Sequence, residues 1–275
     1  MATTAFLEPA KGVPSVHTLG VVPYLNALPL LSDLPRDVRQ EPADPSVLAE
    51  RLAAGRYDAA LLPVAEALRG LGGGFVGRFG IACDGEVDSV LAFLPRAGPP
   101  ASWPSRVVLD PASRTSVALL RVLLERRHGL TPRYETAASP GPDPRAYPDA
   151  IVLVIGDRAM ERRRAFPGGV LDLGAEWKAW TGLPFVFARW TARAGMSDAE
   201  KEALGRMLDG AATRGMLRRD ELAAEQGPRH GLSPAEARRY LGSSIRYALG
   251  ERAEAGLARF ATELRALEGG LPCST

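Results

Sequence analysis

The chain has 275 residues, which is enough for one large domain or for two domains of ordinary size. Its 34 Lys and Arg residues nearly balance 32 Asp and Glu residues, and the formal net charge of +2 provides no overall field for binding nucleic acid or a membrane surface. Two cysteines and three scattered histidines argue against a disulfide framework and against a zinc site.

The first 16 residues are rich in Pro, Ala and Thr and are expected to form a flexible leader. They lack the continuous apolar segment of a secretory signal, and no run of roughly 18 apolar residues occurs in the chain. We therefore expect a cytoplasmic protein that contacts no membrane.

The apolar run Leu19–Val22 predicts a buried strand, and a rigid turn with Pro23, Tyr24 and Asn26 follows it directly. Apolar residues resume at Leu28. An α/β protein presents polar groups in this way at the carboxyl end of its sheet. Two interpretations remain open: either Asn26 caps a helix while Tyr24 packs, or both side chains face a ligand.

A helix from Ser46, its expected N-cap, to Arg56 is predicted next, and a buried strand, Tyr57–Leu62, and a helix, Val64–Leu71, come after it. Residues 72–77 then satisfy the G-x-G-x-x-G spacing of dinucleotide-binding loops. That motif requires a strand before it and a helix after it, whereas here a helix precedes and the strand Phe79–Cys83 follows. We interpret the segment as a flexible connection.

The polar segment Asp84–Ser89 separates two apolar runs, and Ser89 stands where the second strand, Val90–Leu94, begins. It is either a hairpin turn or a loop that faces a ligand cleft, with Glu86 and Asp88 beside the serine. Residues 95–104, PRAGPPASWP, have the composition of a linker, and we place a domain crossing near them.

Residues 110–116, DPASRTS, lie between a strand, Arg106–Leu109, and a helix predicted over Val117–His128. A helix N-terminus has unpaired N–H groups and a partial positive charge, so it favours a carboxylate or phosphate. The hydroxyls and the guanidinium that would assist it are those of Ser113, Arg114, Thr115 and Ser116. The simpler alternative is helix capping by Ser113 or Thr115.

The β-branched run Ala150–Ile155 predicts a central buried strand that ends at Gly156 and Asp157, where glycine permits close approach of a ligand or simply forms the turn. A helix to about Phe166 follows, and its Arg162–Arg164 cluster indicates a solvated face.

The apolar run Leu183–Trp190 predicts the strand that returns to the first domain. Helices are predicted over residues 197–215, with Ser197 and Glu200 forming a capping box, and over 220–226, 233–249 and 252–267. The expected lobes are residues 17–94 with 190–275, and residues 95–189.

Several segments, in order across nearly the whole chain, closely resemble the MqnA family, the chorismate dehydratases of the futalosine pathway to menaquinone. The most specific are VPYLNALPL (Val22–Leu30) and LDPASRTSVALLRVLL (Leu109–Leu124), and IGDRAM (Ile155–Met160) and EWKAWTGLPFVFARW (Glu176–Trp190) support them. The combination of YLN-x-x-PL with DPxSRTS is the pattern on which the resemblance chiefly rests.

The resemblance implies an α/β, two-lobed fold like that of type II periplasmic binding proteins, with a ligand cleft between the lobes. It also implies a hydro-lyase that eliminates water from chorismate to give 3-[(1-carboxyvinyl)oxy]benzoate, without metal or other cofactor. Chorismate is the implied partner, and neither nucleic acid nor membrane is expected. The oligomeric state stays open.

By the family match, the catalytic residues are Asn26 and Ser89. The residues implied to bind substrate are Tyr24, Ser113, Arg114, Thr115, Ser116, Gly156 and Asp157. The general base is not identified: Glu86 and Asp88 are candidates by position only, and a carboxylate of the substrate itself could accept the proton.

Three alternatives remain. A non-catalytic binding protein for a small carboxylate would share this fold, but it would need an export signal. The later enzyme of the same pathway, which acts on a futalosine-derived substrate, also shares the fold. A regulatory ligand-sensing domain is less favoured, because no DNA-binding helix pair or basic face accompanies it.

Overall fold

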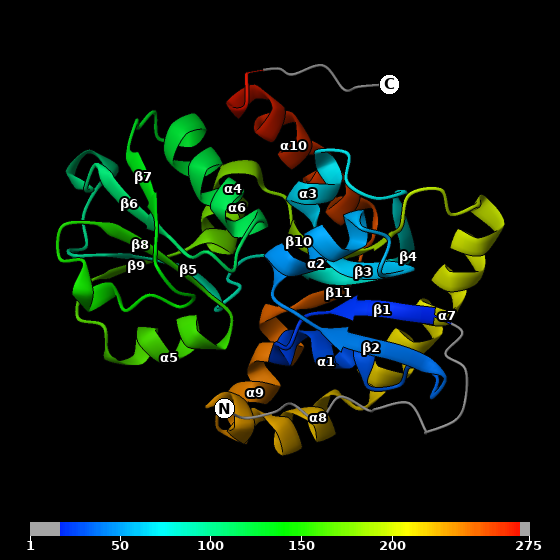
Figure 1. The fold of residues 1–275 in the computed structure, drawn as a ribbon. Helices are drawn as coiled ribbons and strands as arrows, with labels where there is room; N and C mark the ends of the chain where they lie inside the picture. Colours follow the sequence, from blue (N-terminus) through cyan, green and yellow to red (C-terminus); the bar gives the residue numbers. More distant parts are fainter. Residues whose placement is uncertain (1–16, 270–275) are drawn as a thin grey trace. The chain divides into compact units, whose positions relative to one another are not determined.

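A computed structural model describes residues 17–269 of the chain, and these divide into two compact units (Figure 1). Of the described residues, unit 1 contains 17–82 and 186–250, and unit 2 contains 83–185 and 251–269. Each unit has its own sheet, and helices cover it. No helix within residues 17–269 combines the length and the apolar character needed to cross a bilayer.

The sheet of unit 1 has six strands in the order β11-β4-β10-β3-β1-β2. β1 pairs in parallel with both β2 and β3, and β10 pairs antiparallel with β3. The strands are β1 (His17–Val21), β2 (Val38–Pro42), β3 (Ala59–Pro63), β4 (Phe75–Cys83), β10 (Phe185–Ala192) and β11 (Arg246–Ala248). The fully buried β3 matches the continuous apolar character that predicted a buried strand here.

Helices cover both faces of this sheet: α2 and α3 lie on one face, and α1, α7 and α8 lie on the other (Figure 1). The α-helices of unit 1 are α1 (Leu28–Leu31), α2 (Pro45–Ala53), α3 (Val64–Leu68), α7 (Asp198–Leu217), α8 (Arg219–Gln226) and α9 (Pro234–Arg239). Short 3-10 turns occupy η1 (Leu25–Ala27) and η5 (Gly227–His230), and α9 continues as a π-helical segment, η6 (Tyr240–Ser244).

Unit 2 contains a five-stranded sheet in the order β7-β6-β8-β5-β9. β6 pairs in parallel with β7 and β8, whereas β5 pairs antiparallel with β8 and β9. The strands are β5 (Val90–Leu94), β6 (Arg106–Leu109), β7 (Arg133–Thr136), β8 (Ile151–Ile155) and β9 (Gly169–Asp172). The prediction that residues 150–155 form a central buried strand is confirmed, because β8 lies in the middle of the sheet and all five of its residues are buried.

On this sheet, α4 and α6 lie on one face and α5 lies on the other (Figure 1). The helices of unit 2 are α4 (Thr115–Arg121), its π-helical continuation η3 (Val122–Arg127), α5 (Asp157–Ala165), α6 (Leu173–Thr181) and α10 (Glu251–Leu267), with 3-10 turns at η2 (Pro100–Ser102) and η4 (Pro144–Ala146). The cluster around Phe93, Val152 and Val154 fills the α5 face, where Phe166 packs edge-on against Phe93 at 5.1 Å between ring centroids.

The units differ from the two predicted lobes in their boundaries. The first boundary falls between Ala82 and Cys83, so the Pro-rich residues 95–104 connect β5 to β6 inside unit 2. α10 groups with unit 2 because Phe260 packs edge-on against Phe185 and Trp177, with ring centroids 4.9 and 6.1 Å apart. The expected leader, residues 1–16, lies outside the described residues.

Two local predictions were wrong. Asp44, not Ser46, occupies the N-cap position of α2, so the capping prediction there fails. The helix predicted over 233–249 ends at Ser244, because the next residues form β11 and pair with β4.

By contrast, the predicted capping box of Ser197 and Glu200 is present at the start of α7. The glycine-rich segment also has a helix, α3, before it and a strand, β4, after it, which is the order that excludes a dinucleotide-binding loop.

We predict that Gly215→Ala destabilises unit 1, because a Cβ at this position of α7 would collide with the backbone carbonyl oxygen of Pro29 in α1. Overpacking against backbone costs about 1–3 kcal/mol. Gly210→Ala on the same helix is the matched control, since its Cβ would meet only the guanidinium of Arg214 at 3.5 Å. In thermal unfolding, G215A is expected to lower the Tm while G210A leaves it unchanged or raises it. Equal Tm values for the two variants would contradict close packing of α1 on α7.

Candidate functional site

Several candidate residues of unit 2 meet at one edge of its sheet. β8 and β9 both pair antiparallel with β5, so the carboxyl ends of β6, β8 and β9 lie beside the amino end of β5. The register places Val90 opposite Ile155 and Leu91 opposite Asp172. The loops that begin or end there carry Ser89, the DPASRTS segment and Gly156, which are far apart in sequence. Such an edge is where open α/β sheets bind ligands.

Ser89 is buried and is tied to the end of β8 through its backbone. The N–H of Gly156 donates to the Ser89 carbonyl oxygen at 2.8 Å. Gly156 has φ 69° and ψ −154°, a conformation open to glycine and strained for other residues, and Asp157 begins α5 directly after it. The turn that glycine was predicted to form is therefore present, and contact of Gly156 and Asp157 with substrate stays a prediction.

The buried carboxylate of Asp110 organises the DPASRTS segment. It accepts hydrogen bonds from the backbone N–H groups of Ala112 at 3.0 Å, Gly141 at 3.1 Å and Ile155 at 3.4 Å. Burial raises the pKa of Asp110, and these three N–H groups act in the opposite direction. Sequence reasoning did not single out Asp110, although an aspartate that starts a turn after a strand is a recognisable Asx-turn pattern.

The hydroxyl residues of the same segment are buried, whereas Arg114 is exposed. α4 begins at Thr115, and Arg114 in the cap position makes no side-chain hydrogen bond to the first turn. Neither Ser113 nor Thr115 is the cap residue of α4, so the simpler alternative of side-chain capping is wrong. The prediction that residues 113–116 bind a carboxylate remains untested by this geometry.

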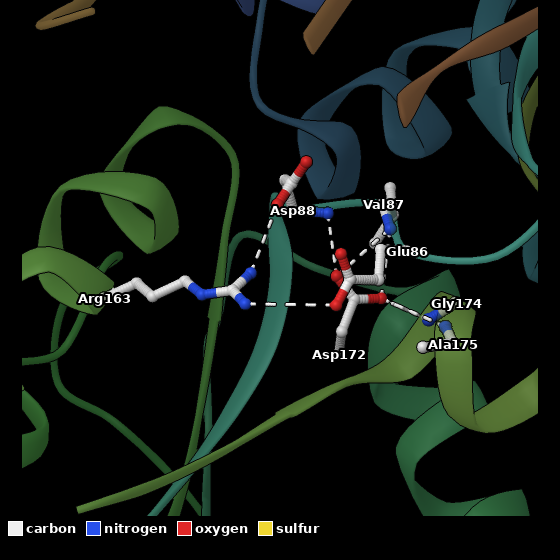
Figure 2. Close-up of polar contacts among 7 residues, drawn as sticks. All are labelled: Glu86, Val87, Asp88, Arg163, Asp172, Gly174 and Ala175. Carbon is white, nitrogen blue, oxygen red and sulfur yellow. Dashed lines mark hydrogen bonds and ion pairs between the residues drawn. The ribbon is translucent and has the colours of Figure 1, made fainter. Parts of the chain in front are cut away.

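A second buried carboxylate, Asp172, binds the loop that precedes Ser89 (Figure 2). It caps α6 by accepting from the N–H groups of Gly174 at 3.0 Å and Ala175 at 3.1 Å. It also accepts from Val87 N–H, 3.0 Å from both carboxylate oxygens, and from Asp88 N–H at 2.7 Å. Burial raises the pKa of Asp172, with the backbone N–H groups opposing it. Its position before a helix is the only sequence pattern that could have marked it.

Asp88 is in the left-handed backbone region, with φ 62°, which costs a residue with a side chain on the order of 1 kcal/mol. Its nearly buried carboxylate forms an ion pair with Arg163 of α5 at 3.1 Å, so the Arg162–Arg164 cluster is not simply a solvated face. Glu86 is exposed and lies 4.0 Å from Arg163 (Figure 2). β4 and β5 belong to different sheets, so the hairpin interpretation of residues 84–89 is wrong.

In unit 1, Asn26 lies in the turn at the carboxyl end of β1 and is the only asparagine of the chain. Its Nδ2 donates to the hydroxyl of Tyr240 at 2.9 Å. Its Oδ1 is enclosed and has no hydrogen-bond partner among residues 17–269. Leaving a buried acceptor unpaired costs about 1–3 kcal/mol, so this oxygen is a place where a water or ligand donor would stabilise the protein.

Asn26 does not cap a helix: Tyr24 occupies the cap position of η1, and Ala27 occupies that of α1. The capping interpretation is therefore wrong. Tyr24 is half-buried two residues before Asn26. Tyr240 was not singled out from the sequence, where nothing distinguished it from other apolar positions of an expected helix.

We predict that Asp110→Asn destabilises unit 2, because an amide can turn only one oxygen toward the three N–H groups that the carboxylate now accepts. A lost buried hydrogen bond to a charged group costs about 1.5–3 kcal/mol. Chemical denaturation should show a lower midpoint with an unchanged m-value. Asp149→Asn is a suitable control, since Asp149 is largely exposed and its carboxylate pairs with Arg106 at the protein surface, at 2.8 Å. Wild-type stability of D110N would argue against Asp110 as the organiser of this loop.

Most of the chain is similar in sequence to known proteins. A family model described as menaquinone biosynthesis matches residues 17–266. The chorismate dehydratase of Thermus thermophilus is 36% identical over 207 residues, which cover 70% of this chain and 73% of that protein.

Solved structures with a similar fold have little sequence identity to this chain. Protein AF1704 of Archaeoglobus fulgidus superposes with a TM-score of 0.71 at 16% identity, and covers 93% of this chain and 98% of that one. The periplasmic aliphatic sulphonate binding protein SsuA of Escherichia coli gives a TM-score of 0.62 at 17% identity, with 94% and 89% of the two chains covered. These likenesses confirm the expected α/β fold of the periplasmic-binding-protein type.

Proposed function

Because the chain belongs to the menaquinone-biosynthesis family, we propose that it is a chorismate dehydratase, a hydro-lyase that converts chorismate to 3-[(1-carboxyvinyl)oxy]benzoate and water. The name of the Thermus relative supports this choice within the family. The structural observation that carries the proposal is the buried amide of Asn26, which donates to Tyr240 and whose own Oδ1 has no donor within residues 17–269.

The reaction removes one proton and one hydroxide from neighbouring ring carbons. The C–H beside the enolpyruvyl ether is conjugated through the ring diene to the ring carboxylate, so its loss gives a delocalised dienolate. Expulsion of the adjacent hydroxyl then completes an aromatic ring. Aromatisation supplies the driving force, and the overall change is redox-neutral. The protein must bind two carboxylates, orient the leaving hydroxyl and exclude water.

We assign Asn26 to the leaving hydroxyl. An amide oxygen that accepts the hydroxyl O–H orients the C–O bond, and the amide N–H₂ group can stabilise charge on the departing oxygen. The hydrogen bond to Tyr240 fixes the plane of the amide. Because Oδ1 is enclosed by protein, binding must be accompanied by a small rotation of the amide or of its neighbours.

In unit 2 we assign one substrate carboxylate to residues 113–116. Buried hydroxyls at the start of a helix, with the exposed guanidinium of Arg114 beside them, are suitable donors for an anion. Ser89, at the same sheet edge, is assigned to the reacting centre. The remaining proposed contacts are Tyr24, Gly156 and Asp157.

Two further features belong to the proposal. We assign the proton to a carboxylate of the substrate itself. The enzyme acts in the cytoplasm on a small-molecule substrate, and its nearly balanced charge provides no overall field for nucleic acid or a membrane surface.

A ligand-binding protein without catalytic activity is the second candidate, because the sulphonate-binding protein has the same fold. One assay separates the two. Purified protein is incubated with chorismate, and the products are followed by mass and by ultraviolet absorbance. A product lighter by one water with an aromatic spectrum supports the dehydratase, whereas saturable binding of unchanged chorismate supports the binding protein.

We predict that Asn26→Ala lowers kcat by at least about 100-fold, as removal of a group that stabilises the transition state does elsewhere, while chorismate still binds. Steady-state kinetics and calorimetry measure the two effects. Tyr240→Phe keeps the amide but removes its acceptor, and a smaller loss in kcat is expected. Unchanged turnover in N26A would exclude the assigned role.

Since Asn26 is the only asparagine, protein labelled with ¹⁵N-asparagine gives a single side-chain amide pair in an NMR spectrum. The reaction product is expected to shift this pair in the wild type. A spectrum unmoved by saturating product would place Asn26 away from the ligand.

We predict that Arg114→Ala raises the KM for chorismate about 10-fold or more with a smaller change in kcat, because a charged hydrogen bond to a carboxylate contributes about 1.5–3 kcal/mol. Arg133→Ala provides the control, since Arg133 is also exposed but stands at the amino end of β7, opposite Arg106, whereas residues 113–116 follow the carboxyl end of β6. A KM equal in the two variants would remove Arg114 from the proposed anion site.

A further inference from the structure

Asp88 stands directly before Ser89 and was one of two carboxylates placed by position as a candidate base. The structure instead binds it on two sides: its carboxylate pairs with Arg163 at 3.1 Å, and its N–H donates to Asp172 at 2.7 Å. We propose that Asp88 is a positioning residue for Ser89, held by Arg163 and Asp172, and not the group that accepts the substrate proton. The inference rests on the proposed function only in taking Ser89 as a substrate contact.

The backbone around Asp88 explains why such anchoring is needed. A residue with a side chain rarely adopts φ 62°, so the turn persists only where surrounding contacts hold it. Asp172 supplies one anchor by accepting the consecutive N–H groups of Val87 and Asp88 (Figure 2). The next residue, Ser89, enters the sheet edge with its carbonyl oxygen bound to Gly156 N–H. The direction in which Ser89 leaves the turn is thus set by this conformation.

α5 contacts the segment twice. Gly156, the residue before α5, binds the backbone of Ser89, and Arg163, near the other end of the helix, binds the side chain of Asp88. These two contacts fix the segment relative to the carboxyl end of β8. Arg163 can therefore change the position of Ser89 through Asp88.

Arg163 also compensates the negative charge of Asp88 beside Ser89. Chorismate carries two carboxylates, and an unneutralised carboxylate beside Ser89 would repel it. The side chain of Asp88 is only 8% exposed, so solvent screens it little, and the guanidinium of Arg163 compensates its charge instead. The side chain of Glu86 is 61% exposed, so water screens its charge. Its contact with Arg163, at 4.0 Å, therefore contributes little.

The same pairing argues against Asp88 as a base. A general base must be free to take a proton from the substrate, whereas Oδ1 of Asp88 accepts a hydrogen bond from the guanidinium of Arg163 at 3.1 Å. Losing a true general base costs about 100- to 10,000-fold in rate. Replacing a positioning carboxylate by an amide of the same shape should cost much less, particularly because asparagine tolerates positive φ better than most residues.

The test uses the full-length protein in five forms: wild type, D88N, R163A, the double variant D88N/R163A, and R164A as the control on an exposed neighbour of the same helix. D88N is expected to keep kcat within about 10-fold of wild type. R163A is expected to lower kcat/KM by at least about 10-fold, because it removes the guanidinium that compensates the charge of Asp88. The double variant should recover much of that loss, and R163K should recover part of it.

Several kinetic results would overturn the proposal. A loss in kcat beyond about 100-fold in D88N would identify Asp88 as the base. A double variant no better than R163A would show that Arg163 acts on substrate directly and not through Asp88. Failure of R163K to improve on R163A would exclude charge compensation.

A second measurement needs no turnover. Amide hydrogen exchange of Val87 and Asp88 in the ligand-free protein should be faster in R163A than in wild type and unchanged in R164A, while exchange in the central strand β8 stays constant. Unchanged exchange at Val87 and Asp88 would overturn the anchoring role. If wild-type protein converts no chorismate, the proposed function fails, but faster exchange in R163A still supports the anchoring of the turn.

Discussion

Two buried carboxylates hold the candidate loops of unit 2 in place by accepting backbone N–H groups. A buried charge must be compensated, and the N–H groups of a buried loop need acceptors, so each requirement is met by the other. Asp172 receives four N–H groups, two from the segment before Ser89 and two from the first turn of α6. Asp110 joins its own turn to Gly141 and to the end of β8. Loss of either acceptor would leave several backbone N–H groups without the partner they now have.

Unit 1 fixes its candidate residue by different means. Asn26 lies in a short 3-10 turn and is held by one side-chain hydrogen bond to Tyr240, which is 214 positions away in sequence. Tyr240 begins a π-helical segment, a distortion often found where a helix serves a function. The helix that follows Asn26, α1, packs on α7 so closely that only glycine fits at position 215. The position of Asn26 therefore depends on C-terminal residues that pack around it.

Whether a protein of this fold binds a ligand or transforms it depends on a few side chains. Sheet edges with strand-end loops serve solute-binding proteins as well as enzymes, so the architecture alone does not set the activity. The proposed elimination needs only orientation of a hydroxyl, recognition of carboxylates and removal of water, because aromatisation makes the later step favourable. In the proposed mechanism, an amide and a serine on this scaffold carry out the chemistry. Positioning accuracy then becomes the main contribution of the protein, and the anchored turn at Asp88 contributes to it.

The sequence by itself determined the most apolar strands and many helix positions, because these follow from the periodicity of apolar residues and from local capping, as at β8 and Ser197, whereas the partly exposed β2 and β11 were not predicted. It also identified Asn26, Ser89 and residues 113–116 as candidate site residues, since polar residues next to apolar strands can be recognised in the sequence. Only the tertiary structure decided which residues support them. Asp110, Asp172, Arg163 and Tyr240 act through contacts with distant segments, and α10 joins unit 2 through aromatic packing with Trp177 and Phe185. The failed helix after Ser244 has the same cause: pairing of β11 with β4 overrides a local helical pattern that contains no information about the partner strand.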